Sequence, residues 1–409
     1  MRERLVLVGN GMASVRLLER LAQHAPGRFD ITVVGAEPRP GYNRVLLSSV
    51  LAREVEEAEC RVRDRPWYMR AGVRLITGAP ATAIDVAERE VVVGDATVLP
   101  FDHLVLATGS NPIRLAKPGM DLPGVFTFRD LADVAAIREA GSRASNAVVI
   151  GGGLLGIEAA YGLARAGVET TLVHVMDRLM ERQLDARAAH LVKAAVEAKG
   201  VRVVLEADTA AVEGTGRAEA VRLADGRVLA ADLVVVAVGV RPSTELARGA
   251  GLDVQRGIVV DDGLETSARG VYAIGECAEH RQAVYGLVEP AYEHAEVLAR
   301  RLGGERASYP GSVLATSLKV SGLPVFSAGL VADQTPGERI LLSDPRAGTY
   351  RKLMVHEGRL IGSLLVGDIA DSRWHLDLIR TGEPVGAFRH DLMFGFPAER
   401  ERAGQREAA

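Results

Sequence analysis

The sequence predicts an α/β fold with two nested Rossmann-like domains and a small C-terminal α+β domain. Two glycine-rich turns, each between a short apolar run and a helical run, indicate the two Rossmann-like units. After Tyr309 the pattern changes to short apolar segments separated by turn residues, which predicts the third domain. A chain of 409 residues is also longer than the length that usually folds around one hydrophobic core, so two or three domains are expected.

The first unit begins with the apolar strand Leu5–Val8, which is followed by a glycine turn. The turn residues expected to hold a diphosphate are Gly9, Gly11, Met12, Ala13 and Ser14, with serine in the third glycine's place. Glycine lets the chain turn tightly, so that a diphosphate can approach the free N–H groups at a helix start. The next strand, Ile31–Val34, ends near Glu37, whose carboxylate can accept from both hydroxyls of an adenosine ribose. The alternative is a structural βαβ turn without a ligand.

The run Pro38–Ser49 follows, and Arg44 is the only charge in its apolar second half. Arg44 is therefore either a solvated arginine or a residue beside a cofactor. Val91–Val93 has polar flanks and is predicted to be a strand. Leu104–Gly109 is a buried strand ending in A-T-G, where the glycine lets the chain leave the domain beneath a bound ligand.

The second unit centres on Ala147–Gly162, which reads AVVIGGGLLGIEAAYG. Gly151, Gly153 and Gly156 have the G-x-G-x-x-G spacing after a β-branched strand and before an alanine-rich helix. That order is typical of a dinucleotide-binding unit. A single copy would be a weak indication, but this chain carries two.

The strand after this helix, Thr170–Val173, ends at His174, 18 residues after Gly156. An acidic residue at this position is typical of NADH binding. A neutral histidine can bond to a 2′-hydroxyl, whereas a protonated one can face a 2′-phosphate, and Arg178 is near enough in sequence to help with a phosphate. Because no arginine stands at the strand end itself, NADH is favoured slightly over NADPH.

The remaining segments complete the first unit and form the third domain. A buried strand at Leu233–Val238 leads to a turn at Gly239, and the segment Gly270–Cys277 precedes a helix at Pro290–Leu302. The expected elements of the third domain are strands at Ser317–Val320, Val325–Leu330, Ile340–Leu342, Tyr350–Val355 and Leu360–Val366 and a helix near Trp374–Thr381. The expected domains are 1–112 with 241–308, then 113–240, then 309–396, followed by a frayed tail at 397–409.

Composition excludes several function classes. The formal net charge of −4 provides no basic field for nucleic acid or for an anionic membrane. No apolar run approaches the ~18 residues that span a bilayer, and the N-terminal residues do not resemble a signal peptide. The two cysteines, Cys60 and Cys277, lie far apart, which fits a reducing cytoplasm and excludes a CxxC pair. The nine histidines show no metal-ligand spacing, so no metal is expected.

Phrases spread over the whole chain resemble one protein family. They are GNGMA at 9–13, the run 37–49, GGGLLGIEAA at 151–160, LMERQLD at 179–185, IGECA at 274–278 and YGLVEP at 285–290. The family is that of the FAD/NAD(P)-dependent pyridine nucleotide oxidoreductases, flavoproteins with two dinucleotide-binding domains. Within it, the chain most resembles the flavoprotein part of the NAD(P)H nitrite reductase large subunit and the electron-transfer subunit of assimilatory nitrate reductase. Rubredoxin reductases are the group that this chain resembles next.

In that family the first unit binds FAD, and the resemblance implies which residues contact it. Glu37 would hold the adenosine ribose, Ala79 would lie near the adenine and Arg44 beside the flavin. Glu276, where the family usually has aspartate, would reach the ribitol or the diphosphate. The other expected cofactor contacts are Ser48, Ala107, Thr108, Gly109, Gly239, Gly275 and Lys319.

The resemblance also implies that the second unit binds NAD(P)H. The expected contacts are Gly151, Gly153, Leu154, Leu155, Gly156, Glu158, His174 and Arg178. Glu158 has two possible roles. It is either a stabilising acid near a helix N-terminus or a ligand of the nicotinamide amide that pairs with Arg44. In the second role, Glu158 and Arg44 are the expected catalytic residues.

The resemblance implies an FAD-dependent NAD(P)H oxidoreductase that passes electrons singly to a redox partner in nitrite or nitrate assimilation. The partner would be an iron–sulfur, sirohaem or molybdenum protein, and the chain a cytoplasmic monomer or homodimer. Alternatives are a rubredoxin or ferredoxin reductase, an NAD(P)H oxidase and, from another class, a non-catalytic flavoprotein redox sensor. Two cysteines cannot hold the metal centres of a complete nitrite reductase. They also offer no thiol pair for disulfide reduction.

Overall fold

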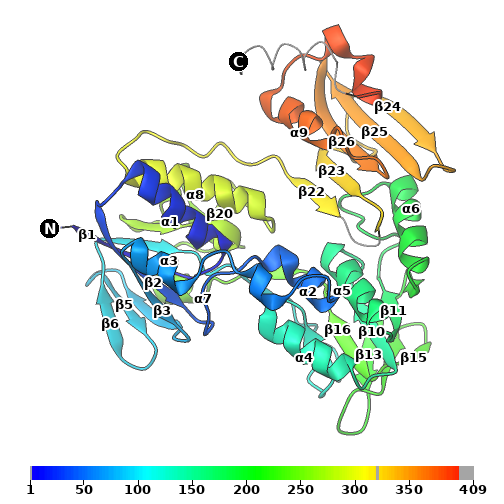
Figure 1. Cartoon of the computed structure of the whole chain (residues 1–409), viewed down its shortest axis with the longest axis horizontal. Coiled ribbons are helices and arrows are strands. Elements are labelled where there is room, and N and C mark those ends of the chain that lie inside the picture. Colours follow the sequence, from blue (N-terminus) through cyan, green and yellow to red (C-terminus); the bar gives the residue numbers. More distant parts are fainter. Residues whose placement is uncertain (1, 319–321, 396–409) are drawn as a thin grey trace. The chain divides into compact units, whose positions relative to one another are not determined.

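The computed structural model describes residues 2–318 and 322–395, so Lys319 lies outside the described residues. The chain divides into two compact units (Figure 1). The first consists of 1–113, 129–131 and 239–312, and the second of 114–128, 132–238 and 313–409. Within 2–318 and 322–395, no helix has the length and apolar character needed to cross a bilayer.

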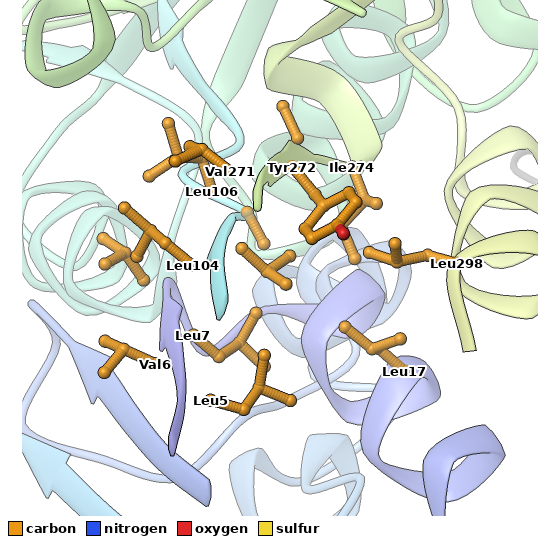
Figure 2. Packing of buried hydrophobic residues seen from close by; sticks show 14 of the residues in the cluster. Leu5, Val6, Leu7, Leu17, Leu104, Leu106, Val271, Tyr272, Ile274 and Leu298 are labelled. Carbon is orange, nitrogen blue, oxygen red and sulfur yellow. The ribbon is translucent and has the colours of Figure 1, made fainter. Parts of the chain in front are cut away.

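The core of the first unit is a five-stranded parallel sheet in the order β19-β7-β1-β2-β3. Its strands are β1 (Glu3–Val8), β2 (Phe29–Gly35), β3 (Val73–Thr77), β7 (His103–Leu106) and β19 (Val271–Ala273). Helices α1 (Met12–His24) and α8 (Val288–Leu302) contact each other. Figure 2 shows Leu5 and Leu7 of β1, Leu17 of α1 and Leu298 of α8 in one buried cluster. This packing fixes the turn that follows β1 at the carboxyl edge of the sheet.

Smaller elements complete the first unit. Three short sheets pair antiparallel neighbours, except that β18 and β20 run parallel. They consist of β4 (Ala81–Asp85), β5 (Glu90–Val93) and β6 (Thr97–Pro100), then β8 (Ser110–Pro112) and β17 (Val240–Pro242), then β18 (Ile258–Val260), β20 (Ala278–His280) and β21 (Ala283–Val284). The short helices are α2 (Leu47–Leu51), α3 (Arg65–Arg70) and α7 (Glu245–Gly249).

The second unit contains another five-stranded parallel sheet, in the order β12-β11-β10-β16-β9. Its strands are β9 (Val125–Thr127), β10 (Asn146–Ile150), β11 (Glu169–Val173), β12 (Val201–Val204) and β16 (Leu233–Val236). An antiparallel sheet of β13 (Thr209–Glu213), β14 (Ala220–Leu223) and β15 (Val228–Ala230) accompanies it. The helices are α4 (Leu131–Gly141), α5 (Leu154–Arg165) and α6 (Ala186–Glu197).

The C-terminal part of the second unit is an antiparallel sheet in the order β22-β23-β26-β25-β24. The strands are β22 (Ala315–Leu318), β23 (Val325–Gly329), β24 (Glu338–Asp344), β25 (Thr349–His356) and β26 (Arg359–Val366), and helix α9 (Ser372–Thr381) packs on them. The predicted fold class is confirmed, because both parallel sheets and the C-terminal α+β part are present. The residue boundaries of three separate domains stay a prediction.

Candidate functional site

The first glycine turn leaves β1 with a backbone that only glycine adopts easily. Gly9 has φ +108°, and a Cβ there would lie 2.1 Å from the carbonyl oxygen of Ala107. Ser14 is fully buried and its hydroxyl donates to the Gly9 carbonyl at 2.8 Å, so serine replaces the third glycine without loss of packing.

The start of α1 is open towards a ligand. Gly11 is the N-cap of α1, no side chain caps the helix, and no neighbouring group lies within 4 Å of where a Gly11 Cβ would stand. Uncapped N–H groups at the positive end of a helix dipole suit a diphosphate. The turn and helix start therefore fit the diphosphate of FAD.

Glu37 follows β2 and is held by two neighbours. The Tyr42 hydroxyl donates to Glu37 Oε2 at 2.8 Å, and the Arg44 guanidinium forms an ion pair with Oε1. Burial raises the pKa of Tyr42, so the phenol remains a hydrogen-bond donor. Arg44 also lies over the Tyr42 ring, 4.9 Å from its centroid, and is thus a partner of Glu37 and not a solvated arginine.

The structure places Arg44 against Glu37. The expected place of Arg44 beside the flavin stays a prediction. The expected pairing of Arg44 with Glu158 joins residues of different units and stays a prediction.

Glu276 is held by Ser110 and by Arg129. It lies in a short 3₁₀ turn, Gly275–Cys277, that follows β19. The Ser110 hydroxyl donates to Glu276 Oε2 at 2.7 Å, and Arg129 forms an ion pair with the same oxygen. Arg129 Nε also donates to the Ser110 carbonyl at 3.1 Å.

Sequence reasoning missed Arg129. Its carbonyl accepts from Arg44 Nη1 at 3.0 Å, so Arg129 joins the Glu37 and Glu276 ends of the site. The one feature of the sequence that could have indicated Arg129 is its position as a single arginine directly after the mostly apolar run 125–128. Residues 129–131 belong to the first unit although the sequence on both sides belongs to the second.

A buried histidine lies behind Gly275. The Gly275 N–H donates to His294 Nδ1 at 3.1 Å, and burial lowers the pKa of His294 to about 3. His294 is therefore neutral at physiological pH. Cys277, two residues after Gly275, is fully buried, and its sulfur lies 3.3 Å from the Ile274 carbonyl oxygen. Burial raises the pKa of the thiol, as expected of a packing residue.

The other expected FAD contacts come from several segments of the first unit. A Cβ on Gly275 would lie 3.2 Å from the Ala13 side chain, so these two residues are brought together. The Thr108 hydroxyl donates to the Ser243 carbonyl at 2.8 Å. The remaining positions are Met12 in α1, buried Ser48 in α2, half-buried Ala79 after β3, buried Ala107 after β7, Gly109 (φ +69°) and Gly239 (φ +110°). Their contact with FAD stays a prediction.

The second glycine turn repeats the geometry of the first. Gly151 has φ +120°, and a Cβ on Gly156 would lie 1.8 Å from the Gly151 carbonyl oxygen. Gly153 is the N-cap of α5, again without a side-chain cap, and Leu154 and Leu155 open the helix. This turn fits the diphosphate of NAD(P)H on the same physical grounds.

His174 is already engaged by its own chain. Its Nδ1 accepts from the Gly152 N–H at 3.0 Å, and its Nε2 lies 3.0 Å from a carboxylate oxygen of Glu181. Arg178 contacts Asp177 at 3.0 Å. A contact of His174 with a ribose, which stays a prediction, requires the ring to exchange one of these partners.

Glu158 lies half-buried in the second turn of α5. Its position is compatible with both roles that the sequence left open. Its contact with nicotinamide stays a prediction.

The comparisons with known proteins agree with this geometry. Residues 3–295 match the family described as pyridine nucleotide-disulphide oxidoreductase, and residues 315–383 match the rubredoxin NAD+ reductase C-terminal domain. The chain is 42% identical over 380 residues to a nitrite reductase [NAD(P)H] of Bacillus subtilis, covering 93% of this chain and 47% of the relative. It is 40% identical to the assimilatory nitrate reductase electron transfer subunit of the same organism, covering 92% and 49%. The chain thus spans about half the length of these two relatives.

Two further matches cover nearly the whole of both proteins. The ferredoxin–NAD(+) reductase subunit of a Pseudomonas putida benzene 1,2-dioxygenase system is 30% identical, covering 88% of each chain. The solved ferredoxin reductase for the CYP199A2 system of Rhodopseudomonas palustris has a TM-score of 0.85 and 26% identity, covering 91% of this chain and 93% of the other.

The two N-cap glycines allow a matched test of the two turns. Neither position has a neighbour within 4 Å of an added Cβ, so a valine should leave the fold intact and fill only the ligand space. Gly11→Val should yield protein without stoichiometric FAD. Gly153→Val should keep FAD but lose rapid flavin reduction by NADH. Absorbance of the purified protein and stopped-flow reduction measure both, and full FAD content in Gly11→Val would contradict the assignment of the first turn.

The neutral His294 predicts a dependence of stability on pH. Because the pKa is about 6.5 unfolded and about 3 folded, only the unfolded chain binds this proton between those values. Stability should therefore fall as the pH drops through this window. Gln accepts the Gly275 N–H without titrating, so His294→Gln should show a flatter slope of urea midpoint between pH 4 and 6.5. The exposed His356→Gln serves as control, and equal slopes in all three proteins would refute the prediction.

Proposed function

This chain belongs to the pyridine nucleotide-disulphide oxidoreductase family, and we propose that it passes electrons from NAD(P)H through FAD to a one-electron protein acceptor. The observation that carries the proposal is the pair of equivalent glycine turns. Each turn follows a strand of a parallel sheet and leads into a helix without a side-chain cap. The chain is an NAD(P)H oxidoreductase by family. The acceptor and the assignment of individual site residues are what we propose here.

The residues of the first unit bind and orient FAD. The turn at Gly9–Ser14 holds the diphosphate, and Glu37 holds the adenosine ribose. Arg44 balances the charge of Glu37, while Arg129 balances that of Glu276 near the ribitol. When bound, FAD supplies the ability to accept a hydride and to release electrons one at a time.

The second unit presents the donor. The turn at Gly151–Gly156 holds the NAD(P)H diphosphate, and Glu158 orients the nicotinamide amide. No proton-transferring side chain is required, since the protein contributes by aligning its two cofactors. The preference for NADH over NADPH stays a prediction.

The cysteines argue against a disulfide substrate. Cys60 and Cys277 are both buried and unpaired, and burial raises the pKa of each thiol. Neither is activated as a thiolate nucleophile. Electrons therefore leave from FAD to an external redox centre, because this chain provides no dithiol relay.

The names of the relatives suggest two acceptors. The two Bacillus subtilis relatives favour a role in nitrite or nitrate assimilation, where an iron–sulfur, sirohaem or molybdenum centre would receive the electrons. A ferredoxin-type protein is the second candidate, because the ferredoxin–NAD(+) reductase subunit matches this chain over 88% of both lengths. In both cases the electrons would be received at a protein-bound redox centre.

The proposed acceptor class predicts the substrate range. With NADH as donor, FAD-loaded protein should reduce ferricyanide or a rubredoxin-type or ferredoxin-type protein in steady state. It should not reduce glutathione, lipoamide or coenzyme A disulfides, because it lacks a reactive thiol pair. Disulfide turnover at a rate matching that of ferricyanide would overturn the proposal.

The proposed role of Glu158 predicts a selective defect. Glu158→Gln should slow flavin reduction by NADH by about tenfold, a loss of about 1.4 kcal/mol in transition-state stabilisation, while FAD content stays at the wild-type level. Glu169→Gln, at the exposed start of β11, is the control for charge removal. If stopped-flow rates of the two variants are equal, Glu158 acts only as a helix N-terminal acid.

A further inference from the structure

The segment Leu179–Asp185, here called the linking segment, runs from the second glycine turn to the C-terminal sheet. Both ends lie within the second compact unit. Its residues have no role in the proposed electron transfer. Yet it bonds to the glycine turn at one end and to β23 and β25 at the other.

At the turn, the linking segment holds the Gly152 carbonyl directly and the Gly152 N–H through His174. The Gly152 carbonyl accepts from the Met180 N–H at 3.0 Å. The Gly152 N–H donates to His174 Nδ1, so this nitrogen carries no proton and the neutral ring carries it on Nε2. That Nε2–H donates to Glu181 at 3.0 Å. Glu181 therefore fixes the tautomer and orientation of the ring that supports the turn.

The backbone of the linking segment is strained near its start. Met180 is buried and has φ +50°, which a side-chain-bearing residue rarely adopts. Such a conformation persists only where the surroundings determine it strongly. The N–H groups of Gln183 and Leu184 both donate to the Met180 carbonyl at 2.9 Å, which closes the segment into a compact turn.

At the other end, three side chains of the C-terminal sheet hold the linking segment. The Ser327 hydroxyl donates to the Gln183 carbonyl at 2.8 Å, and the Tyr350 hydroxyl donates to Asp185 Oδ2 at 2.6 Å. Lys352 Nζ lies 3.3 Å from the same oxygen, and the lysine side chain is only 1% exposed. Lys352 Nζ also pairs with Asp333 at 2.6 Å, so Asp185 is one of two carboxylates that balance this buried charge.

We propose that the linking segment makes Glu181 and Asp185 positioning residues, which couple NAD(P)H binding at the second turn to attachment of the C-terminal sheet. The proposal rests on the proposed function, in which that turn binds NAD(P)H. A tighter attachment stabilises the linking segment, which holds Gly152 in the geometry that receives the diphosphate. By linkage, a bound nucleotide must strengthen the attachment by the same factor.

The test measures NAD+ affinity of FAD-loaded protein by calorimetry. Tyr350→Phe and Ser327→Ala each remove one hydroxyl that bonds to the linking segment, and each should weaken NAD+ binding about fivefold with unchanged FAD content. Ser343→Ala removes an exposed hydroxyl from the neighbouring strand β24 and should bind NAD+ as the wild type does. Glu181→Ala should weaken binding as well, and Glu181→Gln, which can still accept from His174, should restore it.

Two further readouts separate coupling from general damage. In a double-mutant cycle, Glu181→Ala and Tyr350→Phe should be non-additive, because they interrupt one path. Saturating NAD+ should also slow hydrogen–deuterium exchange in β25. If Tyr350→Phe and Ser327→Ala bind NAD+ as tightly as the wild type and NAD+ leaves hydrogen–deuterium exchange in β25 unchanged, the coupling is overturned. The assignment of the NAD(P)H site would still stand. A wild-type protein that keeps FAD but binds no NAD+ would overturn the site assignment and the coupling with it.

Discussion

Each nucleotide site depends on the close approach of a diphosphate to the backbone between a buried parallel strand and a helix. The first turn and the second meet this requirement alike, with φ +108° at Gly9 and +120° at Gly151 and uncapped helices after both. The strands before the turns are buried, so each turn begins at a residue that the core holds in place. The helix dipole and free N–H groups then provide attraction without reorganisation.

Charge around the first turn is balanced by arginines from distant sequence positions. Glu37 and Glu276 are acidic side chains of the first unit, and each is paired with an arginine. The bond from Arg44 to the Arg129 carbonyl joins these two ion pairs. Arg129 therefore ties the connector at 129–131 to the first unit, which explains why this short stretch belongs there.

The sequence was sufficient for the central strands of both parallel sheets and for the two turns, whereas edge strands such as β3 and β12 and helices such as α6 were not predicted. Buried strands such as β10 and β16 are continuous β-branched or aliphatic runs, and glycine spacing marks the turns directly. The partners of Arg44, Arg129 and His174 could not be predicted, because they depend on which side chains the fold brings together. His174 is an example. Its position at a strand end suggested a ribose contact, whereas in the fold its two ring nitrogens form hydrogen bonds with Gly152 and Glu181.

Strand β25 shows why the C-terminal sheet belongs with the second unit. On one face, Leu353 and Val355 pack in the apolar core with α9. On the other face, Tyr350 and Lys352 are also buried, although a lysine on an open sheet face would be solvated. Their contacts with Asp185, together with the ion pair of Lys352 and Asp333 at 2.6 Å, account for that burial. A polar side chain buried this way is stable only while its partners remain in place, so the second face of the sheet is suited to these two carboxylates.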